Sequence, residues 1–183
     1  MLVAFINSVK ELKELYQRDE SLKLKNLSEK LIHESALNSD KLKAKIACIA
    51  YVLYKHLSKE HLTSNARYLF FKNRILAGIV RLIGVLEQHN FHEAWAQVND
   101  LIHILNQVDH ELGHYSELTF DKAQTKLASS AYALGLSLQQ ASYLTDASTK
   151  QTFNYVGVTR MHDEIPETNT IADRLQLLKK VLE

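Results

Sequence analysis

Apolar residues recur every three or four positions along most of the chain, which is the spacing that places them on one face of an α-helix. The first amphipathic segment has its apolar positions at Leu2, Phe5, Ile6, Val9, Leu12, Leu15 and Tyr16. The spacing predicts a second helix over 21–37 and a third over about 40–57, with a turn and N-cap at 38–40. Because the third segment is apolar on more than one face, we expect it at the centre of the fold.

Two further helices are predicted in the middle of the chain, over about 66–88 and 91–108, after a loop at 62–65. Their expected core positions are Leu69, Ile75, Leu76, Ile79, Leu82, Ile83 and Leu86, then Trp95, Val98, Ile102 and Leu105. The aromatic residues expected inside the bundle are Tyr51, Tyr54, Tyr68, Phe70 and Phe71. One proline, five glycines and no β-hairpin signal favour long helices. The pattern therefore predicts an all-α fold with an N-terminal multi-helix bundle over 1–118.

After residue 118 the predicted helices become shorter. One helix over 121–134 ends at Gly135, two short helices follow within 137–156, and a last helix is expected over about 170–182. The sequence has no low-complexity linker before this part. We therefore expect a C-terminal tri-helical unit over 119–183 that joins the bundle without a flexible connection.

The two short helices have the sequence signals of caps and a tight corner. Ser137 can cap the first helix, which holds Ala141 and Leu144 inward, and Asp146 begins the turn. Ser148 can cap the second helix. The inward positions expected on that second helix are Thr152, Phe153 and Val156, and the outward positions are Thr149, Lys150, Gln151 and Asn154.

This segment, over about 136–156, resembles the helix-turn-helix family of DNA-binding regulators, with 121–134 as the supporting helix. Small residues at Ala141 and Ser142 fall where the family packs its helices closely, and Ser148 starts the second helix as is common there. Asp146 replaces the usual glycine of the turn, and Asp tolerates the left-handed conformation. The stretches 131–138 and 155–163 are similar to an uncharacterised archaeal family with such a module, and related segments occur in small antitoxin-like proteins.

The resemblance implies a non-enzymatic regulator that binds duplex DNA. In this interpretation Thr149, Lys150, Gln151 and Asn154 face the major groove, because amide side chains pair with adenine edges and lysine with guanine or phosphate. Arg160 would contact a backbone phosphate, while the bundle forms a homodimer or binds a protein partner. Lys plus Arg total 22 and Asp plus Glu 21, so only a local patch can attract nucleic acid.

An interaction module that binds no DNA is the alternative interpretation of the same unit. Four acidic residues lie near the two basic ones in the sequence, and we expect them to offset Lys150 and Arg160: Asp146, Asp163, Glu164 and Glu167. Such an arrangement is unfavourable for a strong DNA binder. The helical scaffold hypothesis predicts a protein partner and no binding to duplexes.

The segment His110-Glu111-Leu112-Gly113-His114 matches the H-E-x-x-H pattern of zinc peptidases. On an α-helix the two imidazoles would share a face and bind one zinc ion, with Glu111 as general base. The extended form of the motif needs glycine at 117 and histidine at 120, where this chain has Glu117 and Phe120. We therefore expect no cofactor, and a zinc metallopeptidase is the alternative from another class.

Composition sets the expected compartment. The only cysteine, Cys48, lies inside an apolar run, so no disulfide can form within the chain and a reducing compartment is favoured. No segment reaches the roughly 20 apolar residues that a membrane-spanning helix needs. The expectation is a cytoplasmic protein that has no membrane partner.

Overall fold

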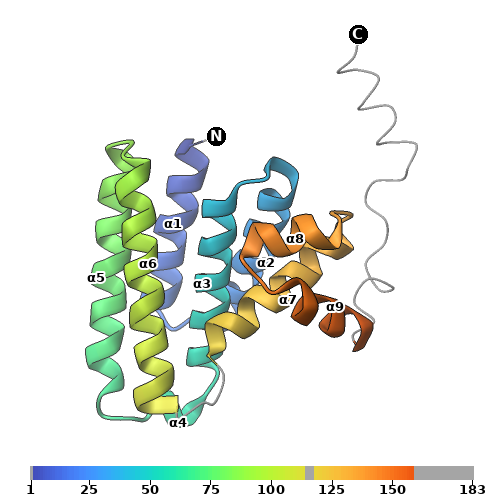
Figure 1. Cartoon of the computed structure of the whole chain (residues 1–183). Helices are drawn as coiled ribbons and strands as arrows, with labels where there is room; N and C mark the ends of the chain where they lie inside the picture. Colours follow the sequence, from blue (N-terminus) through green and yellow to red (C-terminus); the bar gives the residue numbers. More distant parts are fainter. Residues whose placement is uncertain (1, 114–117, 159–183) are drawn as a thin grey trace.

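The computed structural model describes residues 2–113 and 118–158, and every regular element among them is helical (Figure 1). The elements are α1 (Leu2–Gln17), α2 (Ser21–Asn38), α3 (Lys41–Leu57), α4 (Glu60–Thr63), α5 (Tyr68–Glu87), α6 (Phe91–Val108), the π-helical turn η1 (Asp109–Gly113), α7 (Thr119–Ala133), α8 (Leu138–Thr145) and α9 (Thr149–Val158). This confirms the predicted all-α class. The helix expected over 170–182 lies outside the described residues.

Helix α3 is the central element, as its apolar pattern indicates. Asp40 begins it, because its side chain accepts a hydrogen bond from the backbone N–H of Lys43 at 3.0 Å. Ser39, with a φ of 53°, ends α2 in the left-handed conformation. The Ser28 hydroxyl donates to the carbonyl oxygen of Ala47 at 2.8 Å and ties α2 to α3. Helices α1, α2, α6, α7 and α8 all pack against α3.

Helices α5 and α6 form a closely packed hairpin at one side of the bundle (Figure 1). Asn90 caps α6 by accepting a hydrogen bond from the backbone N–H of Glu93 at 3.1 Å. Gly78 of α5 lies against Leu101 of α6, and a Cβ atom there would be 2.6 Å from Leu101 Cδ2. A Cβ atom at this helix crossing would therefore require the Leu101 side chain to shift. Gly84 of the same helix has nothing within 4 Å of such an atom.

Alanine substitutions at these two glycines should change stability in opposite directions. We expect Gly84→Ala to raise the free energy of unfolding by about 1 kcal/mol, because alanine is the better helix former. Gly78→Ala should lower it by about 1–2 kcal/mol, because Leu101 is fully buried and cannot move aside freely. Urea denaturation of the two variants measures both effects. If Gly78→Ala stabilised the protein, α5 and α6 could not be packed as closely at Gly78 and Leu101 as the structure shows.

The start of α5 differs from the sequence prediction. The short helix α4 occupies part of the predicted loop, and α5 begins at Tyr68. Leu69 and Phe70 were expected in the core, but they are 64% and 56% exposed. The reason is the register of the helix: Tyr68 and Phe71 face inward, and the Tyr68 hydroxyl lies 3.3 Å from that of Tyr16. The two residues between them must therefore point to solvent.

Helices α7 and α8 share the core of the N-terminal bundle. α7 crosses the bundle obliquely and packs on α2 and α3 (Figure 1). Six buried apolar residues of α7 and α8 belong to the same contiguous cluster as those of α1–α6; they are Phe120, Ala123, Leu127, Ala131, Ala141 and Leu144. The position 118/119 thus separates two segments of sequence but does not interrupt the core. None of the helices in the described parts has both the length and the apolar character of a membrane span.

Candidate nucleic-acid interface

Helices α8 and α9 are capped as the sequence predicts. The Ser137 hydroxyl accepts from the backbone N–H of Gln140 at 3.1 Å, and the Gln140 side chain accepts from that of Ser137 at 3.0 Å. The Ser148 hydroxyl accepts from the backbone N–H of Gln151 at 3.4 Å. Between the helices Asp146 has a φ of 57°, the left-handed conformation that a glycine usually supplies. Two capped helices therefore meet at a sharp corner.

The corner is fixed to the rest of the molecule by polar contacts. The Asp146 carboxylate forms ion pairs with Lys41 and with Lys45 of α3, the latter at 2.7 Å. Burial acts to raise the pKa of Asp146, but the hydrogen bonds from the two lysines outweigh it and the pKa is lowered. The Gln124 amide of α7 donates to the carbonyl oxygen of Thr145 at 2.8 Å. The direction in which α9 leaves the bundle is thus set by α3 and α7.

These contacts correct one electrostatic expectation. Asp146 was expected to offset Lys150, yet its carboxylate is paired with two lysines of α3. The physical reason is the left-handed turn, which directs this side chain back toward the bundle. Asp163, Glu164 and Glu167 lie outside the described residues.

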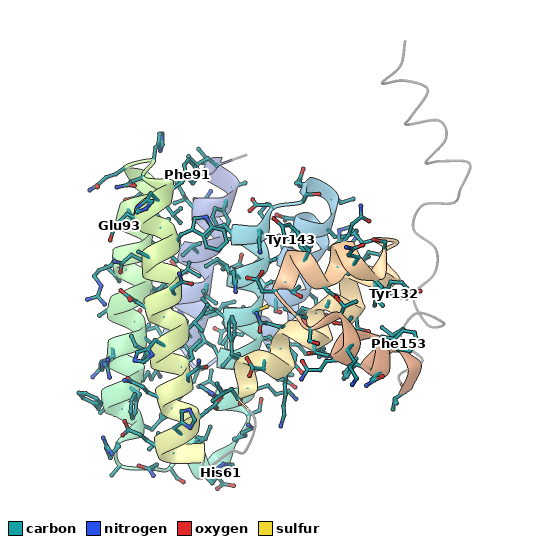
Figure 2. The ribbon with its side chains drawn as sticks, in the orientation of Figure 1. His61, Phe91, Glu93, Tyr132, Tyr143 and Phe153 are labelled. Atoms are coloured by element: carbon teal, nitrogen blue, oxygen red, sulfur yellow. The ribbon has the colours of Figure 1, made fainter. Side chains whose placement is uncertain are left out.

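The outer face of α9 is open to solvent. Thr149, Lys150, Gln151 and Asn154 are all exposed. Thr152 is fully buried, as predicted, but Phe153 is 65% exposed, so its predicted inward position is wrong. A ten-residue helix that packs along one edge buries only a narrow stripe, and here the stripe follows Thr152. Phe153 instead lies on the outer side of α9 at the edge of the molecule (Figure 2).

Lys150, Phe153 and Asn154 consequently share one face, since residues three and four apart are neighbours on a helix. They present an ammonium group, an apolar ring and an amide to solvent. These are the group types that contact phosphate or guanine, the thymine methyl and adenine in the major groove. Arg160, the predicted phosphate contact, lies outside the described residues.

A groove of about 740 Å³ lies beside this face, between α3, α7 and α9. Four of its lining residues are lysines that form two pairs spaced four residues apart, namely Lys55 and Lys59, and Lys122 and Lys126. Among the described residues that line it, none carries a carboxylate. The other lining residues are Tyr51, Thr119, Thr125, Gln151, Asn154, Tyr155 and Val158. The groove is therefore strongly basic, in a chain of nearly balanced charge.

Tyr51 brings two of these lysines together. The Nζ atoms of Lys55 and Lys126 lie 5.6 and 5.8 Å from the centroid of its ring, within the range of cation–π attraction. Burial lowers the pKa of Lys126, and so do the nearby charges of Lys25 and Lys55. Burial, with the proximity of Tyr155, raises the pKa of Tyr51 to about 12, so its hydroxyl keeps its proton at neutral pH. The charged form of Lys126 is therefore held at a cost in free energy, which comes from burial and from repulsion by neighbouring lysines.

A buried polar network positions the lysines of α7. The Asp109 carboxylate accepts from the backbone N–H of Thr119 at 2.6 Å and from its hydroxyl at 2.9 Å. Because Leu118, the N-cap residue, forms no side-chain cap, Asp109 satisfies the first backbone N–H of α7 in its place. Its Oδ1 atom is also 2.9 Å from His56 Nε2 of α3. The network joins the ends of α3 and α6 to the start of α7.

Residues 110–113 of the H-E-x-x-H pattern lie on the π-helical turn η1 instead of a regular α-helix. A π-helix pairs residue i with i+5. Residues four apart over 109–113 therefore do not share a face as they would on an α-helix, and the zinc-binding pattern depends on that shared face. The Glu111 carboxylate pairs with the Arg67 guanidinium at 2.6 Å. No group of three metal-binding side chains occurs among the residues that the structure describes. His114 lies outside them, so the zinc hypothesis stays untested.

Several residues of the site are absent from the sequence-based prediction. The groove lysines come from α3, the N-cap of α4 and α7, which are far apart in sequence, and their only signal is the repeated spacing of four. Phe153 was assigned to the core because an apolar residue next to Thr152 fits an inward stripe equally well. The role of Asp109 could not be recognised in the sequence, because its partner His56 is 53 residues away and its partner Thr119 belongs to the next helix.

Comparison with protein-family models, curated proteins and solved structures gave no match to this chain. The similarity to helix-turn-helix regulators thus stays an expectation from the sequence.

Proposed function

We propose that this protein is a non-enzymatic, cytoplasmic regulator that binds duplex DNA through the outer face of α9. The observation that supports the proposal is the exposed row of Lys150, Phe153 and Asn154 on a short helix that projects from a rigid corner. An α-helix, about 10–12 Å across with its side chains, fits the major groove, which is about 12 Å wide. Specific reading of bases needs such a helix held firmly, and the contacts of Asp146 and Gln124 do this.

The electrostatic support comes from the groove beside α9. Lys150 alone is a weak attraction for a polyanion, because the whole chain has a formal net charge of only +1. The exposed Lys122 at the groove rim adds positive charge on the same side of the molecule. The Asp146 carboxylate is paired with Lys45 of α3, so it offsets little of the positive charge of Lys150 and Lys122. These two lysines form the local positive patch that duplex binding requires.

The test is duplex binding by a double variant. Lys150→Ala/Gln151→Ala should weaken the affinity for a labelled duplex of randomised sequence by about 10–100-fold, since it removes one charge contact and one base-edge contact. Fluorescence anisotropy measures the change. Both positions are exposed, so the thermal midpoint should stay the same.

Lys10→Ala/Gln17→Ala is the matched control, with the same two residue types removed from exposed positions on α1. Its duplex affinity should equal that of the wild type. Equal affinity of both double variants and the wild type would remove α9 as the recognition helix.

A protein-interaction role is the second candidate, and exposed apolar residues favour it. Tyr143, Phe153 and Val158 of α8 and α9 are 71%, 65% and 87% exposed. Side chains of this kind are enriched where proteins associate. This role predicts that the protein does not bind duplexes at low salt.

A further inference from the structure

We propose that the groove between α3, α7 and α9 is a binding site for a small molecule that carries several phosphate groups. The proposal does not depend on duplex binding by α9. It rests on the clustering of four lysines around one concavity and on the neutral hydrogen-bonding groups between them.

Lys55 and Lys126 form the positive centre of the groove. Both lie against the ring of Tyr51, and within the described part of the chain neither has a carboxylate within ion-pair distance. The acidic residue whose charge acts on Lys126 is Glu29, and its carboxylate is paired with Lys25 at 3.6 Å. The positive charge of Lys55 acts unfavourably on that of Lys126, and a bound anion would relieve this repulsion.

The neutral lining fits the oxygen atoms of phosphate groups. Gln151 and Asn154 offer amide donors beside the lysines. Hydrogen bonds from charged donors to phosphate are about twice as strong as neutral ones, so the lysines supply the affinity and the neutral groups the orientation. Lysines on α3, at the N-cap of α4 and on α7 favour several phosphates over one, because one phosphate cannot contact lysines of all three elements equally well.

The size of the groove separates this ligand from nucleic acid. Its volume of about 740 Å³ falls in the range of about 300–1,000 Å³ typical of small-molecule sites. A duplex, whose major groove alone is about 12 Å wide, is too broad to enter a concavity of that volume and would touch only its rim. Gln151 and Asn154 belong to both the rim and the outer part of α9, so a ligand in the groove would compete with a duplex.

Tripolyphosphate is the probe, titrated into the full chain by calorimetry at constant ionic strength. We expect one binding site per chain. Lys55→Gln/Lys126→Gln should weaken the binding at least about tenfold, because two charged donors are lost. Thr125→Glu keeps every lysine and adds a negative charge to the lining, so it should weaken the binding to a similar degree.

The control is Lys10→Gln/Lys13→Gln on α1, which changes the net charge by the same amount as the double variant in the groove. It should bind tripolyphosphate as the wild type does, and circular dichroism should show all variants folded. Lack of binding by the wild type, or equal affinity in all the variants, would overturn the proposal.

A labelled duplex titrated in parallel separates this proposal from the proposed function. Binding of tripolyphosphate without binding of the duplex leaves the groove site standing and removes the α9 interface. The reverse result removes the groove site alone. Displacement of the duplex by tripolyphosphate in the wild type, but not in Lys55→Gln/Lys126→Gln, supports the shared rim.

Discussion

Replacing Asp109 with alanine is expected to lower the free energy of unfolding by about 3–5 kcal/mol. The Asp109 side chain is 1% exposed, and it accepts hydrogen bonds from Thr119 and contacts His56. Its removal leaves His56 Nε2 and the backbone N–H of Thr119 buried without partners, and each lost partner carries a desolvation penalty. The start of α7 should loosen first, because Asp109 is its substitute cap.

The same carboxylate predicts a pH dependence. Burial alone would raise the pKa of Asp109, but the hydrogen bonds from His56 and Thr119 lower it below the ordinary value of 3.8. Because the pKa of Asp109 is lower in the folded protein than in the unfolded chain, its ionised carboxylate contributes its full stabilisation at pH values above the ordinary pKa of 3.8. The contribution is lost as the pH falls through the folded pKa. The stability difference between the wild type and Asp109→Asn should therefore shrink at pH values below about 4.

Urea denaturation at several pH values measures both effects. Asp100→Ala is the matched control, since Asp100 is an exposed aspartate on α6, and its effect should stay within about 0.5 kcal/mol. An Asp109→Ala variant as stable as Asp100→Ala would contradict the proposed role of the network.

Replacing Leu127 with alanine should cost about 2–5 kcal/mol and should destabilise the whole molecule at once. Leu127 of α7 is 1% exposed and belongs to the core cluster that also contains residues of α1–α6. Trp95, the only tryptophan, lies on α6 and packs against that core. We expect the unfolding midpoint of Trp95 fluorescence to shift as far as the midpoint of the far-ultraviolet circular dichroism.

Leu22→Ala, at a leucine of α2 that is 70% exposed, is the control and should leave both midpoints unchanged. Two separate transitions in Leu127→Ala, with the Trp95 midpoint that of the wild type, would instead show that α7–α9 fold independently. That outcome would also weaken the view that α3 fixes the direction of α9.

The helices could be predicted because their signals are local. Asp40 and Ser137 follow the N-capping rules. The predicted helix breaks near Ser39 and His89 fall at residues with positive φ, a conformation that ends a helix. The periodicity also identified α3 as central. Errors occurred where a helix has apolar residues on neighbouring faces, as at Phe70 and Phe153, because spacing alone cannot decide which face meets a neighbour.

The candidate site was only partly predictable for the same reason. The exposure of Lys150 and Asn154 follows from the pattern of one short helix. The groove requires Lys55 of α3 and Lys126 of α7 to approach the same Tyr51 ring, and the packing of these helices is a tertiary contact. Likewise, that Asp146 pairs with Lys45 depends on how α8 docks on α3.

The most direct test of the central claim, that α9 presents a duplex-binding face, is a salt titration of the wild-type protein with a labelled duplex. We expect saturable binding that weakens at least about tenfold between about 50 and 200 mM salt, as the release of about two counterions requires. No saturable binding at the lowest salt concentration would contradict it, and so would an affinity that does not change with salt.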